Sequence, residues 1–313
     1  SGHTDVVPTE GQSWNSNPFK LINKKKRFYG RGTCDMKSFI AVSLDLVSKI
    51  NINNLKKPIH LIFSYDEEIG CVGIQKIVPF IKKLNPKPMY CIVGEPTGMK
   101  VVNEHKGKKN FLVQFNGVEA HSSLIHNGVN SINFCTEFIE FLKDLQKSIS
   151  TSSKNSKYNP PYSTINVGLI KGGIALNIIP KYCEIEFEIR DTPEINSEKI
   201  LKKIKNYLKL LEKKMKKINK KCFITFKNTN DFPPLKTDEK KKIIQMALQK
   251  LKSNSINSVS FGTEAGVFNK LGLETIVCGP GNIEQAHKPN EYIEESQIIK
   301  CQNFLKNIIE YLY

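Results

Sequence analysis

Two histidines stand in stretches that could bring them to a metal ion. His3 lies two residues before Asp5 in the opening "SGHTDVVP", and His287 lies in a Gly- and Pro-rich turn, "GNIEQAHKPNEYI", near the other end of the chain. Between them, carboxylates end apolar runs or sit in turns, without an obvious helix-capping role. These acids are Asp35, Glu67, Glu68 and Glu95. If the fold brings these groups together, imidazole and carboxylate can share a metal site.

The number of acids favours two cations over one. Several carboxylates in one cleft would raise one another's pKa unless cations hold them. Two divalent ions meet this need, since three ligand carboxylates and a hydroxide balance them and one Glu stays free as a base. Imidazole with carboxylate and without thiolate fits Zn²⁺, with Co²⁺ or Mn²⁺ as alternatives. Such a pair, about 3.5–4 Å apart, clamps a carbonyl and generates a hydroxide near neutral pH. The sequence therefore predicts amide hydrolysis.

The elements that must position these groups alternate between strands and helices. Residues 39–50, "FIAVSLDLVSKI", predict a helix, and 59–64, "IHLIFS", predict a buried strand. "MYCIVGEP" and "LETIVCGPG" repeat the second pattern: an apolar run followed by Gly, Pro or an acid. The interpretation is an α/β sheet, whose sites gather beyond the carboxyl ends of the strands.

The middle of the chain has a different pattern of apolar and polar residues. The predicted order is strand, helix, strand, strand, helix, strand. The strands are expected at 111–118, 163–170, 182–190 and 222–226. The first helix has an apolar stripe from Val129 to Leu145 and Asn127 or Asn130 as its cap, the second helix is expected at 197–218, and a loop is expected at 148–162. That order is ferredoxin-like. We expect a split α/β domain over 1–105 and 231–313, interrupted by a ferredoxin-like lid over 106–230. His105 and Lys106 fit either a hinge or a plain connector.

The bulk properties limit the classes of protein. The 313 residues exceed what one core usually serves. No stretch approaches the roughly 20 apolar residues of a membrane span, and the start does not resemble a secretion signal. Eight scattered cysteines without a CxxC pair are typical of a reducing compartment, so we expect a cytoplasmic protein with no membrane partner. Because His3 lacks a strand that would deliver it, we also expect the sequence to be N-terminally incomplete.

The net charge of +17 raises nucleic acid as a partner. The lysines lie in runs such as "EKKMKKINKK", which are typical of solvated helix faces, and no groove-reading motif accompanies them. We therefore expect no nucleic acid partner. Cys34 and Cys71 flank acidic motifs, but their spacing predicts buried packing and no zinc knuckle. His60 and His126 are interpreted as structural.

Nine ordered blocks of this chain resemble a known family, the zinc aminoacylase/deacetylase metallopeptidases. The blocks are "GHTDVVP", "FYGRGTCDMK", "SYDEEIGCVG", "CIVGEPTGMKVV", "HKGKKNF", "EAHSSL", "GGIALNIIP", "SFGTEAGVF" and "CGPGNIEQAHKPNEYI". The variants "RGTCDMK", "YDEEIGC" and "FGTEAG" are similar to those of the members that hydrolyse N2-acetyl-L-ornithine. The members that act on succinyl-diaminopimelate usually carry Ser-Asp where Glu264 and Ala265 stand.

The resemblance implies that the split domain is a mixed-sheet, zinc-peptidase-like catalytic domain and that the inserted ferredoxin-like unit is a lid and dimerisation domain. It also implies a role for each matched residue. His3 and Glu95 would bind one metal, Glu68 and His287 the other, and Asp35 both. Asp5 would orient His3, and Glu67 would be the general base. His121 would stabilise the oxyanion in the neighbouring subunit's site of a homodimer. Substrate contacts would come from Asn177, Arg190, Gly262 and Thr263, although an ordinary cross-strand ion pair is an alternative for Arg190.

The function implied by the resemblance is a cytoplasmic enzyme that uses two Zn²⁺, or Co²⁺, to remove acetyl from N2-acetyl-L-ornithine in arginine biosynthesis. Its partner would be a small N-acyl amino acid, and Glu67 would act on a metal-bridging water. The alternatives are a sibling hydrolase, either a succinyl-diaminopimelate desuccinylase or a dipeptidase or carboxypeptidase, and two non-enzymes, a basic nucleic-acid-binding protein or an inactive fragment.

Overall fold

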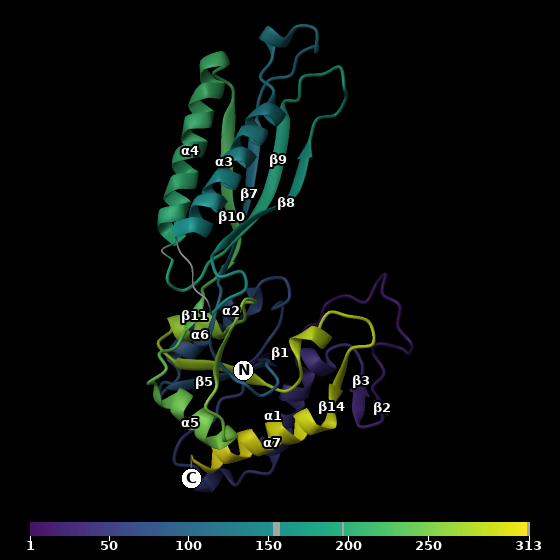
Figure 1. Ribbon diagram of the computed structural model, residues 1–313, viewed down its shortest axis with the longest axis vertical. Coiled ribbons are helices and arrows are strands. Elements are labelled where there is room, and N and C mark those ends of the chain that lie inside the picture. The colour runs from purple at the N-terminus through teal and green to yellow at the C-terminus, as the bar shows by residue number, and fades with distance from the viewer. Residues whose placement is uncertain (153–156, 196, 312–313) are drawn as a thin grey trace. The chain divides into compact units, whose positions relative to one another are not determined.

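The structure is a computed structural model that describes residues 1–313 except 153–156, 196 and 312–313 (Figure 1). It divides into two compact units. Unit 1 joins Ser1–His105 with Phe232–Tyr313, and unit 2 is the continuous stretch Lys106–Asp231. Two stretches that are distant in the sequence therefore share one fold in unit 1.

Unit 1 is a mixed sheet with helices on both faces. Its strands are β1 (Gly2–His3), β2 (Ile22–Lys24), β3 (Arg27–Tyr29), β4 (Phe63–Ser64), β5 (Tyr90–Pro96), β6 (Val101–His105), β11 (Leu235–Lys236), β12 (Ile256–Val259), β13 (Glu274–Gly279) and β14 (Tyr292–Glu294). Its helices are α1 (Ser38–Ser48), α2 (Val72–Lys83), α5 (Lys242–Leu251), α6 (Ala265–Lys270) and α7 (Glu295–Glu310), with short helical turns at Thr33–Lys37, Ile52–Asn54 and Ile283–Gln285.

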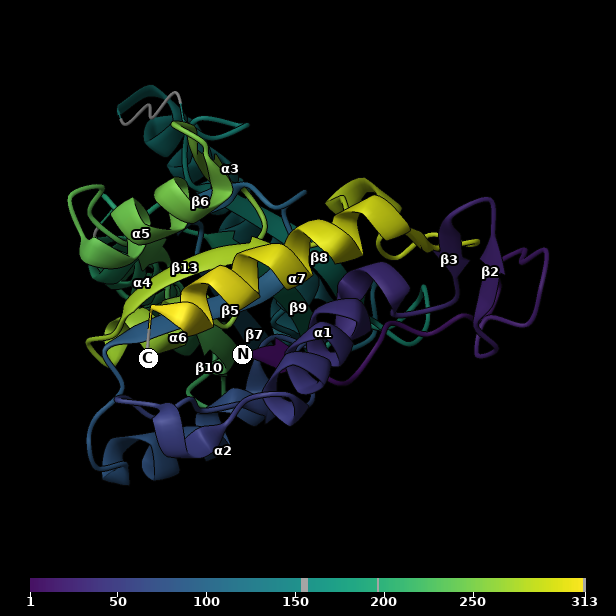
Figure 2. The same cartoon turned by 90° about the horizontal axis from the view of Figure 1, so that it is seen from below.

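The central sheet buries both of its faces. Its strand order is β11-β6-β13-β5, with β12 paired to β6, and β13 runs parallel to β5. Ile276 and Cys278 of β13 pack in a core with α1, α5 and α7, whereas Val277 faces the core formed with α2 and α6. Figure 2 shows α7 and α1 side by side over this sheet. The continuous apolar runs of the sequence follow from this two-sided burial.

The strands deliver the candidate site residues at their ends. β1 pairs in parallel with β4, where His3 lies opposite Ser64, and the Gly94 amide donates to the Ser1 carbonyl at 3.1 Å. β1 therefore lies between β4 and β5. As parallel neighbours, these strands place the residues at and after their carboxyl ends at one edge.

A second, small sheet has the order β14-β3-β2. Tyr292 of β14 lies opposite Tyr29 of β3, and the two strands are antiparallel. The residues just after β3 and just before β14 therefore meet, although they are distant in the sequence.

Unit 2 contains β7 (Lys108–Asn116), α3 (Ser131–Ser152), β8 (Thr164–Gly172), β9 (Tyr182–Arg190), α4 (Ser197–Ile218) and β10 (Phe223–Phe232), whose last residue belongs to unit 1. The sheet order is β10-β7-β9-β8, and α3 and α4 cover one face (Figure 1). This is the β-α-β-β-α-β arrangement of a ferredoxin-like unit. Alternate residues of β9, from Cys183 to Ile189, are buried, as its pattern predicts. Asn130 Oδ1 accepts the amides of Ile132 and Asn133, so Asn130 is the cap of α3.

Two predicted elements need correction. The strand predicted over 59–64 extends only over Phe63–Ser64, because its partner β1 pairs there with just Gly2 and His3. The loop predicted over 148–162 begins too early, since α3 continues to Ser152. Ile149 is buried in the unit 2 core, and this packing keeps the polar segment around it helical. Residues 153–156 of that predicted loop lie outside the described residues.

All eight cysteines are buried and free, as their spacing predicts. In the part of the chain that the structure describes, no helix has both the length and the apolar character needed to cross a membrane.

Candidate metal centre

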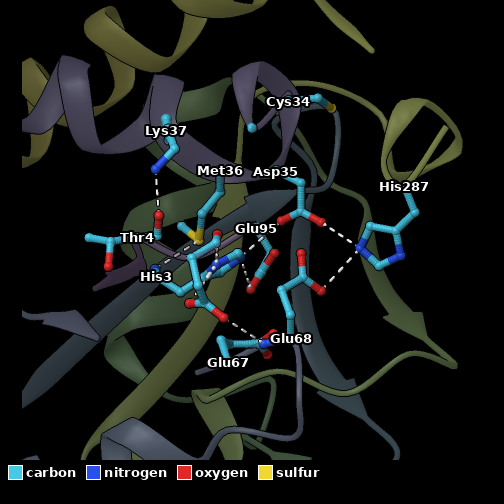
Figure 3. Close-up of polar contacts among 12 residues, drawn as sticks. His3, Thr4, Cys34, Asp35, Met36, Lys37, Glu67, Glu68, Glu95 and His287 are labelled. Atoms are coloured by element: carbon cyan, nitrogen blue, oxygen red, sulfur yellow. Dashed lines mark hydrogen bonds and ion pairs between the residues drawn. The ribbon is translucent and has the colours of Figure 1, made fainter. Parts of the chain in front are cut away.

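Five of the residues singled out in the sequence converge in unit 1 (Figure 3). They form two overlapping groups whose possible ligand atoms all lie within 4.8 Å of one another: His3, Asp35 and Glu95, and Asp35, Glu68 and His287. Asp35 belongs to both groups. The chain thus places a shared carboxylate between two sets of donors.

The two imidazoles approach opposite oxygens of the shared carboxylate. His3 Nε2 lies 3.0 Å from Asp35 Oδ1, and His287 Nε2 lies 3.1 Å from Asp35 Oδ2. His3 Nε2 also lies 3.7 Å from Glu95 Oε1, and His287 Nε2 lies 3.2 Å from Glu68 Oε2. Nitrogen and oxygen donors of this kind suit Zn²⁺, and the arrangement offers one position on each side of Asp35.

The charges of the group are strongly coupled to one another. Burial opposes protonation of His3, yet its hydrogen bonds with Asp35 and Asp5 raise its pKa far above the usual value. Hydrogen bonds with Asp35 and Glu68 raise the pKa of His287 to about 10. Without a metal, the two imidazolium groups therefore supply the positive charge. Burial and the neighbouring Asp35 carboxylate raise the pKa of Glu95 well above its usual range, which indicates a surplus of negative charge.

Asp5 lies behind His3, but its backbone is the closer partner. His3 Nδ1 lies 2.9 Å from the Asp5 carbonyl oxygen and 3.4 Å from Asp5 Oδ1. When Nδ1 donates its proton to this carbonyl, the lone pair of Nε2 is left facing Asp35. Asp5 Oδ2 accepts the backbone amide of Glu68 at 3.1 Å, so Asp5 also connects β1 to the loop that carries Glu67 and Glu68.

Glu67 sits beside the two groups in the loop after β4. The surrounding protein, together with the negative charges of Glu264 and Glu68, raises its pKa to about 8. The Cys71 thiol donates to Glu67 Oε1 at 3.2 Å, and burial raises the pKa of that thiol, so the thiol stays protonated. A carboxyl group that titrates near neutral pH is suited to accept and return a proton.

The other predicted site residues are divided between the two units. Thr263 is buried in unit 1, where its hydroxyl lies 3.2 Å from His105 Nε2 and accepts the Ala265 amide; Gly262 precedes it. His121, Asn177 and Arg190 belong to unit 2. His121 is exposed and lies 2.7 Å from Ser123 Oγ, and the Asn177 carbonyl accepts the Ser122 amide. Arg190 forms an ion pair of 3.0 Å with Glu188, which lies on its own strand β9, whereas the alternative considered for Arg190 was an ion pair across strands.

Sequence reasoning missed two buried residues next to the cluster, Arg31 and Glu291. They form an ion pair of 2.7 Å in which both side chains are 1% exposed. Both stand in blocks that drew attention for another reason, "GRGTCDMK" for Asp35 and "HKPNEYI" for His287. An Arg and a Glu in two motifs that each carry a ligand could have been recognised as a pair. Cys34 and Cys71 are buried as predicted, and the Cys34 thiol donates to the Asn282 carbonyl.

Comparison with known proteins decides the family. A family model described as Peptidase family M20/M25/M40 matches residues 1–311. The chain belongs to this family. Members of the M20 family are metal-dependent hydrolases that typically use zinc, in agreement with the nitrogen and oxygen donors around Asp35.

Among M20 relatives, the chain is similar to proteins named acetylornithine deacetylase. It is 35% identical over 309 residues to that of Buchnera aphidicola subsp. Acyrthosiphon pisum (strain Tuc7), which covers 99% of this chain and 79% of the relative. It is 32% identical over 312 residues to that of Pasteurella multocida (strain Pm70), which covers 99% and 78%.

Solved structures show the same fold at lower identity. Aminopeptidase PepT from Bacillus cereus superposes with a TM-score of 0.72 at 21% identity, covering 99% of this chain and 79% of that one. An M20 family metallo-carboxypeptidase from Sulfolobus solfataricus superposes with a TM-score of 0.69 at 19% identity, covering 99% and 83%.

Proposed function

We propose that this protein hydrolyses the amide bond of N2-acetyl-L-ornithine and releases acetate and L-ornithine, a step of arginine biosynthesis. The observation that carries the proposal is the convergence of His3, Asp35, Glu68, Glu95 and His287 around one shared carboxylate in a chain whose relatives are named acetylornithine deacetylase. The "FGTEAG" block, with Glu264 and Ala265 in place of Ser-Asp, supports the acetyl-ornithine substrate over succinyl-diaminopimelate.

The donor set suits two Zn²⁺, with Co²⁺ as an alternative. His3 and Glu95 would hold one ion, Glu68 and His287 the other, and Asp35 would bind both through its two oxygens. When bound, such a pair polarises the acyl carbonyl and lowers the pKa of a water molecule. Neither Cys34 nor Cys71 is needed, because the Cys34 thiol contacts the Asn282 carbonyl and the Cys71 thiol contacts Glu67.

In the proposed mechanism, the chain's own groups move the proton. Glu67 accepts a proton from the attacking water and returns it to the α-nitrogen as the C–N bond breaks, so that ornithine leaves as the free amine. Asp5 keeps His3 oriented through its carbonyl and holds the Glu67 loop through its carboxylate. His121 is proposed to stabilise the oxyanion, and Asn177, Arg190, Gly262 and Thr263 are proposed to contact substrate.

We further propose a cytoplasmic homodimer in which unit 2 serves as the lid and dimerisation domain. β8 is the edge strand of its sheet, and apolar side chains on and after it are exposed, among them Leu169, Ile170, Ile174 and Leu176. A second copy of the chain would cover this surface. Eight free cysteines support a reducing compartment.

A substrate panel tests the proposal. The purified protein is stripped of metal, loaded with Zn²⁺ or Co²⁺, and given N2-acetyl-L-ornithine, N-succinyl-diaminopimelate or a dipeptide. We expect acetate release from the first substrate at a kcat/KM at least tenfold above the others, and loss of that activity with chelator. Preferential release of succinate or of free amino acids from the dipeptide would instead assign the protein to a sibling activity.

A further inference from the structure

One buried carboxylate receives four donors from the loop that carries Asp35. Glu291 Oε2 accepts Arg31 Nη1 at 2.7 Å and the Gly32 amide at 3.0 Å. Glu291 Oε1 accepts the amides of Cys34 and Asp35 at 2.8 and 3.1 Å. Charge-assisted hydrogen bonds to a carboxylate are stronger than those between neutral groups. The backbone that leads into Asp35, up to the Asp35 amide itself, is therefore held by the Glu291 side chain.

The small sheet explains why Glu291 can reach this loop. β3 and β14 are antiparallel, with Tyr29 opposite Tyr292, and the next backbone bond runs from the Gly30 amide to the Glu291 carbonyl at 3.0 Å. The strand pair therefore brings the start of the Asp35 loop and the end of the His287 loop to the same point. The position of the Glu291 backbone is therefore set by the strand pair, independently of the bonds that its side chain makes.

The same network continues to the backbone of His287. Arg31 Nη1 also donates to the Lys288 carbonyl at 3.3 Å, and Arg31 Nη2 donates to Gln12 Oε1 at 2.6 Å. Gln12 Nε2 in turn donates to the His287 carbonyl at 3.1 Å. We name Glu291, Arg31 and Gln12 the loop clamp. It joins two loops whose side chains meet at Asp35 Oδ2 and His287 Nε2.

We propose that the loop clamp positions two metal ligands at once, with Glu291 as the positioning residue for Asp35 and the Arg31–Gln12 link as the positioning group for His287. This inference rests on the proposed ligand roles of Asp35 and His287. A carboxylate that serves two ions must present both oxygens at fixed positions, and its own side chain has no spare atom to anchor it. The anchor must then act through the backbone, which is where Glu291 acts.

The burial of the clamp favours positioning over a contribution to stability alone. An ion pair with both side chains 1% exposed pays a large desolvation cost, and apolar residues of similar size often stabilise a fold equally well. What apolar residues cannot do is accept four hydrogen bonds that fix the direction of a loop. The presence of the buried Arg31–Glu291 ion pair is therefore explained by the geometry that Glu291 imposes on Asp35.

The test is zinc affinity in variants with matched charge changes. Glu291→Gln keeps the size of the side chain and removes its charge and one strong acceptor. Its control is Glu294→Gln, which removes the same charge from the exposed Arg27–Glu294 pair between β3 and β14. Zn²⁺ binding to the metal-free proteins is measured by competition with a chromophoric chelator. We expect Glu291→Gln to bind Zn²⁺ about 10–100-fold more weakly, and Glu294→Gln to differ from wild type by less than about twofold.

Amide hydrogen exchange adds a readout that does not depend on metal. In the metal-free proteins, peptides that contain Gly32, Cys34 and Asp35 should exchange faster in Glu291→Gln, while peptides from β5 keep their protection. Unchanged zinc affinity with a lowered melting temperature would overturn the proposal and leave the pair as a structural one.

A milder variant covers the case in which Glu291→Gln does not fold. Gln12→Ala removes the link between Arg31 and the His287 carbonyl, together with a hydrogen bond from Trp14, at a less buried position, and leaves the Glu291 bonds to the Asp35 loop in place. It should change the visible absorption spectrum of the Co²⁺-loaded protein. It should also weaken binding of the ion assigned to Glu68 and His287 more than binding of the ion assigned to His3 and Glu95. Identical spectra and affinities for Gln12→Ala and wild type would overturn the His287 half of the proposal. A fall in zinc affinity in these variants of a protein that releases no acetate would support the clamp and overturn the proposed substrate.

Discussion

At the scale of single residues, Glu67 is the group whose replacement should separate binding from turnover. Glu67→Gln keeps the shape of the side chain but cannot accept the proton, so we expect kcat to fall about 10²–10⁴-fold with zinc content unchanged. The exposed Glu10, changed to Gln, is the control and should keep full activity. Turnover and metal content are measured on the same preparations. A fully active Glu67→Gln protein would remove Glu67 from the mechanism.

His287 gives a prediction for pH. Hydrogen bonds with Asp35 and Glu68 raise its pKa from 6.5 to about 10 in the metal-free protein, so its contribution to stability is complete below pH 6.5 and is lost as pH rises through 10. Metal binding has the opposite dependence, because a ligand imidazole must lose this proton. Zinc affinity should therefore rise with pH between about 6.5 and 10, with proton release seen by calorimetry in buffers of different ionisation enthalpy.

A matched pair of histidine variants tests this assignment. His287→Asn should lower the number of protons released on zinc binding by about one. His126→Asn, at an exposed position in unit 2, should leave it unchanged. An equal number of released protons in all three proteins would contradict the assignment of His287 as a ligand.

At the scale of elements, the contact between β5 and α1 supports the candidate metal centre, because β5 carries Glu95 and α1 follows Asp35. A Cβ on Gly94 would lie 2.0 Å from the Phe39 ring, so Gly94→Ala must separate the strand that carries Glu95 from the helix that follows Asp35. We expect a loss of about 1–3 kcal/mol in the free energy of unfolding, measured with urea on the metal-free protein. Gly168→Ala, whose Cβ would meet nothing closer than 3.9 Å, is the control. An unchanged urea midpoint in Gly94→Ala would show that the helix moves aside without cost.

Elements were predictable from sequence where local pattern alone decides them. α4 has the bounds predicted for it, Ser197–Ile218, because its apolar stripe is regular, and β5 and β13 follow from their apolar runs. The extent of β4 was not predictable, because a strand is as long as the ladder in which it pairs, and that pairing is not encoded in its local pattern. In the site, acids at strand ends could be identified because parallel strands end together. Glu291 could have been paired with Arg31 from their motifs, but its bonds to the Asp35 loop could not be predicted, because they depend on the register of β3 and β14, which no local pattern encodes.

At the scale of the whole molecule, the exposed apolar surface of unit 2 predicts that two copies of the chain form a dimer. Ile174 is 81% exposed and Leu176 is 101% exposed beside the edge strand β8, so neither contributes to the packing of a single chain. If a second copy covers them, Ile174→Asp with Leu176→Asp should convert a dimer to a monomer while the melting temperature of the monomer stays the same. Sedimentation velocity measures the change. Phe80→Asp, at an exposed apolar position of α2 in unit 1, should leave the dimer intact. A wild-type protein that sediments as a monomer at all concentrations would contradict the dimer, and His121 would then have no neighbouring site to serve.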